Sequence, residues 1–308
     1  MHGLPRKSLH AESVRIKSPC LIPLYEILLP MIVIVLVVLA AYLLVTLFFA
    51  YMIHEYPRKP VKDQPDWGHV SDVRIPTVNG KSLEAWRIEP KGRSRGIVVF
   101  AHGWSRNRDR MVSRARIFGK WGYTTVIHSA RDHGESSSQR GMNALRFAED
   151  IESVLSWIGE PVILYGHSAG SGGAAIAAWR NPERVKLLFM EGSYPYTGEM
   201  LMSLFNWYGR PFRFLFGYMI LFWMNLYYRG RIEKLSPARL APELKMPVML
   251  IHGEKDRRFP LSFAQTLKKA LHPESSDLFI GQGANHSGSS AAPGYEEAIL
   301  RFLEKHPV

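Results

Sequence analysis

The sequence lacks the residues that several kinds of site require. Cys20 is the only cysteine among 308 residues, so no intramolecular disulfide can form and a cysteine-based zinc site is excluded. No H-E-x-x-H motif occurs, and the glycine-rich stretch 166–173 lacks the G-K-S/T ending of a phosphate-binding loop. We therefore expect no metal and no cofactor. Nucleic-acid-binding modules are also missing, so we expect no nucleic-acid partner.

Charged side chains are absent from Ile27 to Ile53. As a helix, this segment would be about 40 Å long, enough to cross a hydrocarbon core of about 30 Å with some tilt. Core helices are rarely so long or so apolar on every face, and a cleaved signal peptide fits poorly because no A-x-A-like site follows. We predict a juxtamembrane segment over 1–26, a transmembrane helix over 27–53 and an extended, proline-containing linker over 54–68.

Basic residues on the two sides of this segment predict its orientation. Four precede it and three follow it closely: Arg6, Lys7, Arg15 and Lys17, then Arg58, Lys59 and Lys62. By a small margin, the positive-inside rule places the large domain on the extracytoplasmic side. The formal net charge of +12 suits an anionic membrane surface. Cys20 lies at the predicted boundary; we expect an unmodified thiol, with acylation as the alternative.

Short apolar runs alternate with helical patterns after residue 68. Strands are predicted over 69–77, 82–89, 96–101, 124–128, 161–165, 185–190, 248–252 and 277–280, the first two joined by an Asn79-Gly80 turn. Helices are predicted over 110–121, 142–158, 261–271 and 292–304. The alternation favours right-handed crossovers and one mostly parallel sheet with helices on both faces, so we predict an α/β domain over 69–308.

The stretch 161–180 reads PVILYGHSAGSGGAAIAAWR and contains G-x-S-x-G between a predicted strand and a predicted helix. This pattern is typical of a nucleophile elbow, a sharp turn that holds Ser168 in strained backbone angles above the sheet. Glycines are expected at 166 and 170 because a Cβ atom would clash there. The backbone N–H of Ala169 would be free to face an oxyanion. A plain glycine-serine turn is the alternative reading.

Two further candidate residues follow later strands. A serine nucleophile needs a base to take its proton and a carboxylate to fix the tautomer of that base. Asp256 and His286 each come after a predicted strand, and the carboxyl ends of parallel strands meet at one edge of the sheet. Glu191 is the rival acid. The rival bases are His102, His128, His133, His167 and His252.

With these motifs the chain resembles the α/β-hydrolase superfamily, in its branch of serine esterases, lipases and aminopeptidase-like enzymes. The resemblance spans roughly residues 70–305 and rests on five motifs in the order of the family: His102-Gly103-Trp104, the Arg131–Ser136 turn, GHSAG, HGEKD and GANHSG. It implies that His286 takes the proton of Ser168 while Asp256 orients His286. It also implies an oxyanion hole built from the backbone N–H groups of Trp104 and Ala169.

The segment between Met190 and Val248 is too long for one crossover and is rich in aromatic residues. This interval commonly carries a cap in the fold, so we predict a mostly helical, aromatic-rich cap insertion over about 194–244. Tyr194, Phe222 and Trp223 are its candidate substrate-binding residues, in an apolar acyl pocket or a surface that meets lipid. Ordinary aromatic packing is the alternative. A second membrane span is disfavoured because the uncharged stretch 214–228 would reach only about 22 Å.

A cluster of arginines follows the predicted oxyanion loop. Its members are Arg106, Arg108, Arg110, Arg114 and Arg116. Such runs are usually solvated, and we expect a solvated face here, with contact to anionic head groups or an acidic substrate as the alternative.

Taken together, the motifs predict a membrane-anchored serine hydrolase that cleaves carboxylic esters through an acyl-enzyme. The expected partners are a small-molecule or lipid-like ester, with an apolar acyl group, and the membrane itself. Two alternatives use the same triad: peptide cleavage by an aminopeptidase-like enzyme, and acyl transfer to another acceptor. In the aminopeptidase-like enzyme, Glu191 and Glu199 would hold the α-amino group of the substrate. A catalytically silent membrane binding protein is the alternative of a different class.

Overall fold

The computed structural model describes residues 24–307, and the chain divides into two compact units after Val45. Helix α1 (Leu24–Met52) crosses this division, so its last turns belong to the larger unit. α1 is the one described helix that is long and apolar enough to cross a membrane, and it is almost wholly exposed. It begins and ends slightly earlier than the predicted 27–53, and Pro30 lies inside it.

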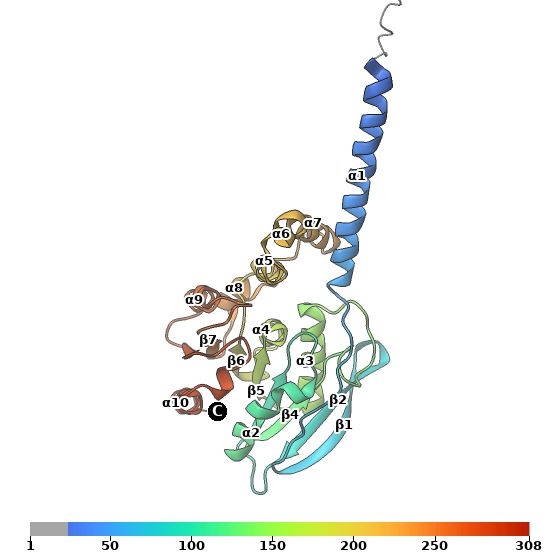
Figure 1. The fold of residues 1–308 in the computed structure, drawn as a ribbon. Helices are drawn as coiled ribbons and strands as arrows, with labels where there is room; N and C mark the ends of the chain where they lie inside the picture. The colour runs from blue at the N-terminus through green and yellow to red at the C-terminus, as the bar shows by residue number, and fades with distance from the viewer. Residues whose placement is uncertain (1–23, 308) are drawn as a thin grey trace, which may run out of the picture. The chain divides into compact units, whose positions relative to one another are not determined.

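The larger unit is built on one eight-stranded sheet (Figure 1). Its strands are β1 (His69–Thr77), β2 (Lys81–Glu89), β3 (Ile97–Ala101), β4 (Thr124–His128), β5 (Val162–His167), β6 (Val185–Glu191), β7 (Val248–Gly253) and β8 (Ser276–Gly281). Their order is β1-β2-β4-β3-β5-β6-β7-β8. β1 and β2 pair antiparallel, β2 joins β4 antiparallel, and the other pairs are parallel. The predicted mostly parallel sheet is therefore confirmed.

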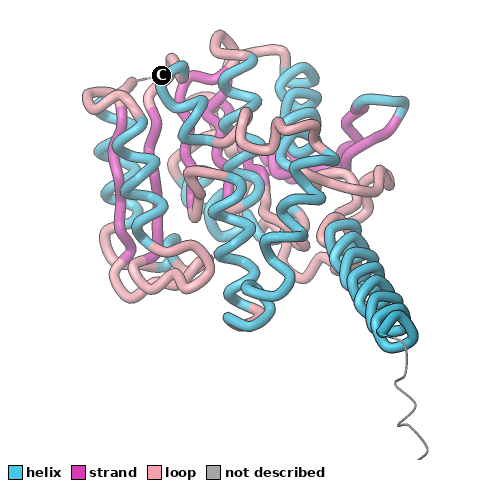
Figure 2. Tube along the Cα trace, turned by 90° about the horizontal axis from the view of Figure 1, so that it is seen from above, coloured by secondary structure: helices cyan, strands magenta, loops and turns pink. Residues whose placement is uncertain are grey.

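Helices cover both faces of the sheet (Figures 1 and 2). α3 (Ala144–Ile158), α4 (Ala169–Arg180), α8 (Pro237–Leu240) and α9 (Leu261–Ala270) pack on one face, in one apolar cluster with the strands. α2 (Val112–Lys120) and α10 (Tyr295–Lys305) pack on the other face. The central strands β3, β4 and β5 are buried along their whole length, which explains the continuous apolar run of β3 and the apolar start of β5.

The hairpin between β1 and β2 turns at Asn79 and Gly80, which have φ angles of 58° and 67°. Positive φ at both positions is the backbone that an Asn-Gly turn supplies with little strain. The register that follows pairs Thr77 with Lys81.

The insertion between β6 and β7 is mostly helical, as the sequence predicts. It holds α5 (Thr197–Trp207), the short α6 (Arg210–Phe212), a π-helical turn (Arg213–Gly217) and α7 (Tyr218–Tyr227). These elements, called the cap below, share an apolar cluster with the last turns of α1. The cluster contains Ala50, Leu201, Phe205, Ile220 and Met224.

The segment 54–68 has no helix or regular strand, and it lies against the body instead of acting as a free spacer. Arg58 donates hydrogen bonds to the carbonyls of Gly134 and Ser136 (2.6 and 2.7 Å). Val61 and Trp67 pack on the cluster that contains α2 and α10. Proline-rich composition predicted the extended backbone, but it carries no signal for these contacts.

Candidate active site

Ser168 lies at a sharp turn between β5 and α4, with φ of 56° and ψ of −122°. This is a strained conformation for a residue with a side chain. A Cβ atom at position 166 would stand 2.6 Å from the carbonyl oxygen of Gly170, and one at position 170 would stand 2.4 Å from that of His102. Both glycines are therefore required by close backbone approach, as the sequence pattern predicts.

The side chains of Ser168, His286 and Asp256 form a continuous hydrogen-bonded chain. The Ser168 hydroxyl lies 2.9 Å from His286 Nε2, and His286 Nδ1 lies 2.6 Å from Asp256 Oδ2. A carboxylate can only accept, so Nδ1 carries the proton and Nε2 is free to accept from the serine. All three side chains are buried, and the residues come from the turns that follow β5, β7 and β8.

Asp256 is fixed by its own turn. Its Oδ1 accepts hydrogen bonds from the amides of Arg258 and Phe259 (2.8 and 2.9 Å). Burial raises the pKa of the Asp256 carboxyl, but the hydrogen bond from His286 and the charges around it outweigh burial, so the pKa lies below its usual value. The carboxylate is therefore ionised at neutral pH, as an orienting acid requires.

Glu191, the rival acid, is engaged elsewhere. Both of its carboxylate oxygens accept from the buried Arg114 at 2.5 Å, and Tyr165 donates to one of them at 2.7 Å. Burial opposes ionisation of Glu191, yet Arg114 beside it brings the pKa of the carboxyl down to about 2. The geometry thus pairs Asp256, and not Glu191, with His286.

The other candidate histidines are all buried, and most of them have structural partners. His252 Nε2 donates to the carbonyl of Phe259 at 2.9 Å, and His167 Nε2 contacts the carbonyl of His286 at 3.2 Å. Burial lowers the pKa of His102 to about 4 and that of His128 to about 3, so both rings are neutral.

The loop with His102, Gly103 and Trp104 passes directly over the elbow. A Cβ atom on Gly103 would stand 2.9 Å from the Cβ of Ser168, so only glycine allows this approach. Trp104 and Ala169 pack in the same apolar cluster, around Phe147. Within residues 24–307, no hydrogen bond uses the amide N–H of Trp104 or of Ala169. The two residues predicted to supply the oxyanion donors therefore pack in one cluster, and Ala169 directly follows Ser168.

His133 supports this loop through a hydrogen bond with Ser105. Its Nε2 accepts from the backbone N–H of Ser105 at 3.3 Å, while Nδ1 donates to the carbonyl of Arg131 at 2.8 Å. Nδ1 also lies 2.9 Å from the hydroxyl of Tyr56, a residue of the segment that follows α1. Burial lowers the pKa of His133 to about 2, which keeps the ring neutral and able to accept from Ser105.

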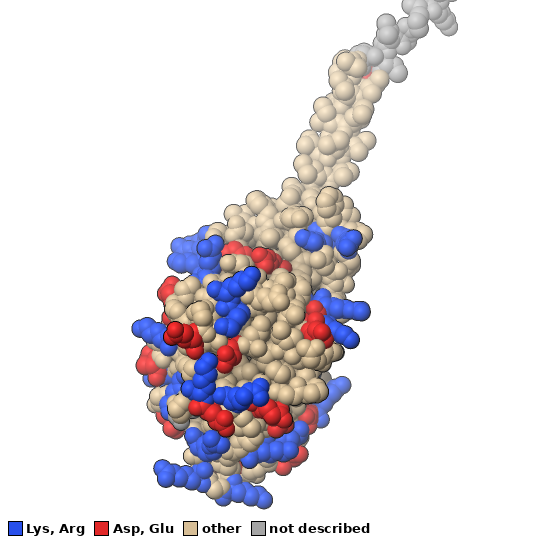
Figure 3. Space-filling view, turned by 90° about the vertical axis from the view of Figure 1, so that its left-hand side faces the viewer, with Lys and Arg blue, Asp and Glu red and all other residues tan. Residues whose placement is uncertain are grey.

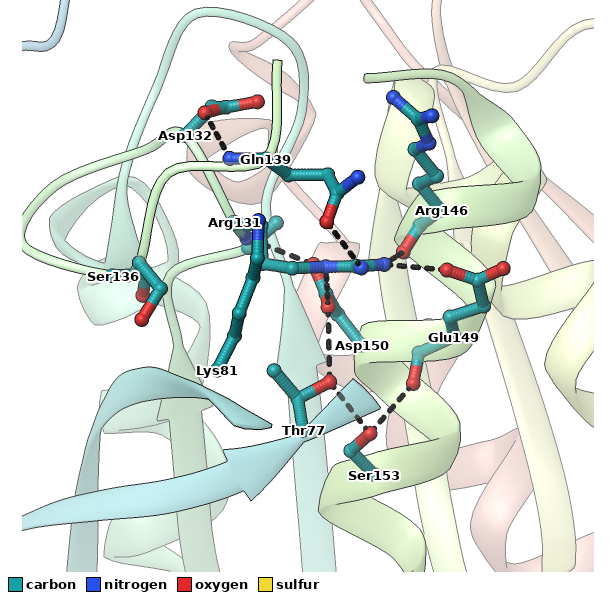
Figure 4. Close-up of polar contacts among 12 residues, drawn as sticks. Thr77, Lys81, Arg131, Asp132, Ser136, Gln139, Arg146, Glu149, Asp150 and Ser153 are labelled. Carbon is teal, nitrogen blue, oxygen red and sulfur yellow. Dashed lines mark hydrogen bonds and ion pairs between the residues drawn. The ribbon is translucent and has the colours of Figure 1, made fainter. Parts of the chain in front are cut away.

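A buried ion pair anchors the Arg131–Ser136 turn to α3 (Figure 4). Arg131 Nε and the Arg131 backbone N–H donate to the two oxygens of Asp150 at 2.6 and 2.8 Å. The guanidinium also reaches the carboxylate of Glu149 at 2.6 Å, and Thr77 donates to Asp150 at 3.3 Å. Burial raises the pKa of Asp150 to about 6 in spite of Arg131. The turn that carries His133 is thus tied to α3 and β1.

The three cap residues predicted to bind substrate have different surroundings. Tyr194 is buried and packs edge-to-face on Phe259, at 5.9 Å between ring centres. Phe259 in turn packs on His286 at 4.8 Å, so Tyr194 stands one layer behind the triad. Phe222 is exposed and points outward, whereas Trp223 donates to the hydroxyl of Thr46 at 3.0 Å on the side of the cap that meets α1. The structure does not bring these two residues into the cluster around His286.

Sequence reasoning missed Phe259, and it misread part of the arginine cluster. Arg108 and Arg114 are buried, and they pair with Asp72 and Glu191. A solvated or lipid-facing role is therefore wrong for these two residues. Their partners lie far away in the sequence, and nothing in the local pattern distinguishes them from Arg106 or Arg110.

No group of three or more histidine, cysteine or acidic side chains that could hold a metal ion occurs between residues 24 and 307.

Comparison with known proteins finds several similar proteins. The family model for serine aminopeptidases of the S33 type matches residues 92–219. A bifunctional esterase/perhydrolase from Acinetobacter calcoaceticus is 30% identical over 92 residues, which is 29% of this chain and 33% of that protein. Protein bem46 of Schizosaccharomyces pombe is 21% identical over 270 residues, covering 77% of this chain and 83% of that protein.

Solved structures show the same fold. An esterase from Pyrococcus furiosus aligns with a TM-score of 0.61 at 16% identity, over 81% of this chain and 99% of its own. A membrane phospholipase A, described as a bacterial virulence factor, aligns with a TM-score of 0.60 at 16% identity, over 91% and 98% of the two chains. The α/β-hydrolase fold predicted from the sequence is therefore confirmed.

Proposed function

We propose that this chain, which has the α/β-hydrolase fold, is a membrane-anchored serine hydrolase that cleaves carboxylic esters. The observation that carries the proposal is the chain of contacts from Ser168 through His286 to Asp256 at 2.9 and 2.6 Å, on a strained strand-to-helix turn. A serine in this arrangement is activated by the adjacent base, and the base is oriented by the acid.

The proposed reaction follows from this geometry. Ser168 Oγ attacks the ester carbonyl carbon while His286 Nε2 takes the hydroxyl proton, and the carbonyl oxygen becomes an oxyanion. The N–H groups of Trp104 and Ala169 donate to the oxyanion, and Asp256 stabilises the imidazolium. Collapse breaks the bond to the alcohol, which leaves with the proton from His286. Water then attacks the acyl-enzyme by the same route and releases the acid. One oxyanion donor is typically worth about 3 kcal/mol of transition-state stabilisation.

An apolar, lipid-like acyl group is the substrate we propose. The cap over the site is built from aromatic and aliphatic side chains, and α5 of the cap packs Met200 and Leu204 on the cluster of Tyr194, Phe259 and Phe263. α1 supports membrane anchoring, since it is long and apolar enough to cross a bilayer. The structural relative described as a membrane phospholipase A agrees with such a substrate.

Turnover of p-nitrophenyl esters, from acetate to palmitate, tests the proposal. The full chain in detergent micelles is the sample, because residues 46–68 pack on the body. Ser168→Ala should abolish turnover and labelling by a fluorophosphonate probe. Ser262→Ala, an exposed serine on α9, is the matched control and should behave as the wild type. Fastest turnover of an ester with an acyl chain longer than acetate would support the proposed apolar pocket.

The same experiment separates the alternatives. Turnover of aminoacyl or peptide substrates, with no ester hydrolysis, would favour the aminopeptidase-like reaction that the matching family model suggests. A wild type that reacts with the probe but hydrolyses nothing would favour acyl transfer to another acceptor. A Ser168 that does not react with the probe would contradict the serine hydrolase.

A further inference from the structure

Helix α7 of the cap presents an apolar stripe to the outside. Tyr218, Phe222 and Leu226 follow one another at four-residue spacing, so they share one face of the helix. Their exposed fractions are 60%, 55% and 60%, whereas Ile220 and Met224 on the other side are buried. Exposed apolar faces of this kind usually mark an interaction surface.

α7 is joined to the end of α1 (Figure 1). Trp223 Nε1 donates to the hydroxyl of Thr46 at 3.0 Å. Phe49 packs edge-to-face on Phe212 and Phe216, with ring centres 5.5 and 5.6 Å apart. Ala50 is buried in the same cluster as Ile220 and Met224. The stripe therefore belongs to a helix that is fixed to the last turns of α1.

The length of α1 sets the depth at which this contact lies in a membrane. α1 has 29 residues and is about 43 Å long, whereas a hydrocarbon core is about 30 Å thick. When the helix spans the core, its last turns reach the head-group layer. Thr46 precedes the helix end at Met52 by about 9 Å of helix. A helix attached there lies at the depth where interfacial amphipathic helices lie.

The charges around the stripe fit an anionic lipid surface. No charged residue occurs between Arg213 and Arg229, while Arg210, Arg229 and Arg231 at the two ends are exposed. Figure 3 shows a mostly uncharged area on the upper part of the larger unit, with both basic and acidic side chains at its margin. An apolar face bordered by basic residues is the pattern of helices that bind head groups and dip into acyl chains.

We propose that α7 lies in the membrane surface, with Tyr218, Phe222 and Leu226 at the boundary between head groups and acyl chains, and that the bilayer is the partner of the cap. Trp223 is not part of this surface, because it faces Thr46. A second copy of the chain is the competing occupant of the stripe. The proposal rests on membrane anchoring by α1, which is part of the proposed function, but not on the hydrolase activity.

Site-specific fluorescence in vesicles tests the proposal. The full chain with Cys20→Ser and Phe222→Cys is labelled with an environment-sensitive fluorophore and reconstituted in vesicles of phosphatidylcholine and phosphatidylglycerol. Leu226→Cys serves as a second probe, and Glu160→Cys, in the exposed turn after α3, is the control. Quenchers are lipids with a nitroxide near the head of the acyl chain, and iodide in the water phase.

We expect the labels at 222 and 226 to lose fluorescence to the lipid nitroxide and to resist iodide, with the control showing the reverse. Quenching of all three labels by iodide alone would overturn the proposal and leave the stripe in water. Resistance of 222 and 226 to both quenchers would also overturn it, because a protein would then cover the stripe. None of these outcomes requires turnover, so a failure here is distinct from a failure of the esterase proposal.

Discussion

The ring of Tyr56 packs edge-to-face on the indole of Trp104, with 4.9 Å between ring centres. Tyr56 lies four residues after the end of α1, and Trp104 carries one of the two proposed oxyanion donors. The same phenol contacts His133, whose ring holds Ser105 of this loop. The segment between α1 and the sheet is therefore part of the support of the proposed active site.

Replacing Tyr56 with alanine should lower kcat for esters by about 10-fold to 100-fold and change KM little. Loss of the ring lets the oxyanion loop shift, and a misplacement of about 1 Å at a reacting centre can cost this much. Tyr56→Phe keeps the stacking and should retain most of the activity. Steady-state kinetics of the two variants check the prediction, and equal losses in both would assign the effect to the hydroxyl.

Truncated chains should distinguish the proposed role of α1 as an anchor from the role of residues 46–58 in supporting the active site. A chain that starts at Thr46 keeps the turns of α1 that pack on the cap and should stay active in detergent. A chain that starts at Lys59 loses Tyr56 and the hydrogen bonds from Arg58, and its kcat should fall at least as far as that of Tyr56→Ala. Thermal unfolding of both chains controls for a simple loss of folding. Equal kcat in the two truncated chains would contradict a role for residues 46–58.

Asp256→Asn should reduce kcat by about 10³-fold to 10⁴-fold, the loss typical for an orienting acid of a catalytic triad. An asparagine can keep contact with His286 Nδ1 but no longer imposes the tautomer or stabilises the imidazolium. The pre-steady-state rate of acylation should fall by about the same factor as kcat. The matched variant Glu191→Gln tests the rival acid, and a larger kinetic loss there, in folded protein, would reverse the assignment.

The pair of Arg114 and Glu191 should dominate the stability of the site. Removing either partner leaves a buried charge unpaired and should cost about 3–5 kcal/mol in the free energy of unfolding. Replacing both with leucine should restore much of this loss, because neither charge is then left alone. Denaturant unfolding of the two single variants and the double variant forms the cycle that checks the coupling. Additive losses would argue against a direct pair.

Acid should destabilise the wild type through the same pair. The pKa of Glu191 is about 2 in the folded protein, below its usual value of 4.5, so the folded state binds fewer protons between these values. The stabilisation is therefore fully present above about pH 4.5 and is lost as the pH falls toward about 2. The shift corresponds to about 3 kcal/mol. Between pH 6 and pH 2, the free energy of unfolding should change less with pH in the double variant Arg114→Leu/Glu191→Leu than in the wild type.

The strands and the elbow could be predicted because their signals are local. Strands such as Ile97–Ala101 are buried on both faces, so every residue in them is apolar, and the elbow needs two glycines at fixed spacing. The order Ser168, Asp256, His286 was enough to name three side chains that lie in contact. These features depend on residues that are close together in the sequence, or on the order of motifs along it.

Pairing across long distances could not be predicted in this way. Arg114 and Arg131 meet Glu191 and Asp150 only after the chain has folded, and in the sequence they look like any other arginine. Tyr56 lies in a proline-containing stretch whose composition indicates a spacer, yet its contact with Trp104 depends on the path of that stretch over the body. The outward direction of Phe222 depends on which side of α7 meets α1.

If α1 anchors the protein as proposed, the contact between Thr46 and Trp223 links the cap to the helix in the bilayer. A bilayer that is thinner than the apolar length of α1 forces the helix to lean, whereas a thicker one lets it stand upright. The last turns of α1 pack on the cap through Thr46, Phe49 and Ala50, and His54 Nε2 lies 2.8 Å from the Tyr228 hydroxyl, so under the proposed membrane anchoring we expect such a change in angle to act on the cap. Turnover should then depend on the acyl length of the surrounding lipid even when the substrate is a soluble ester.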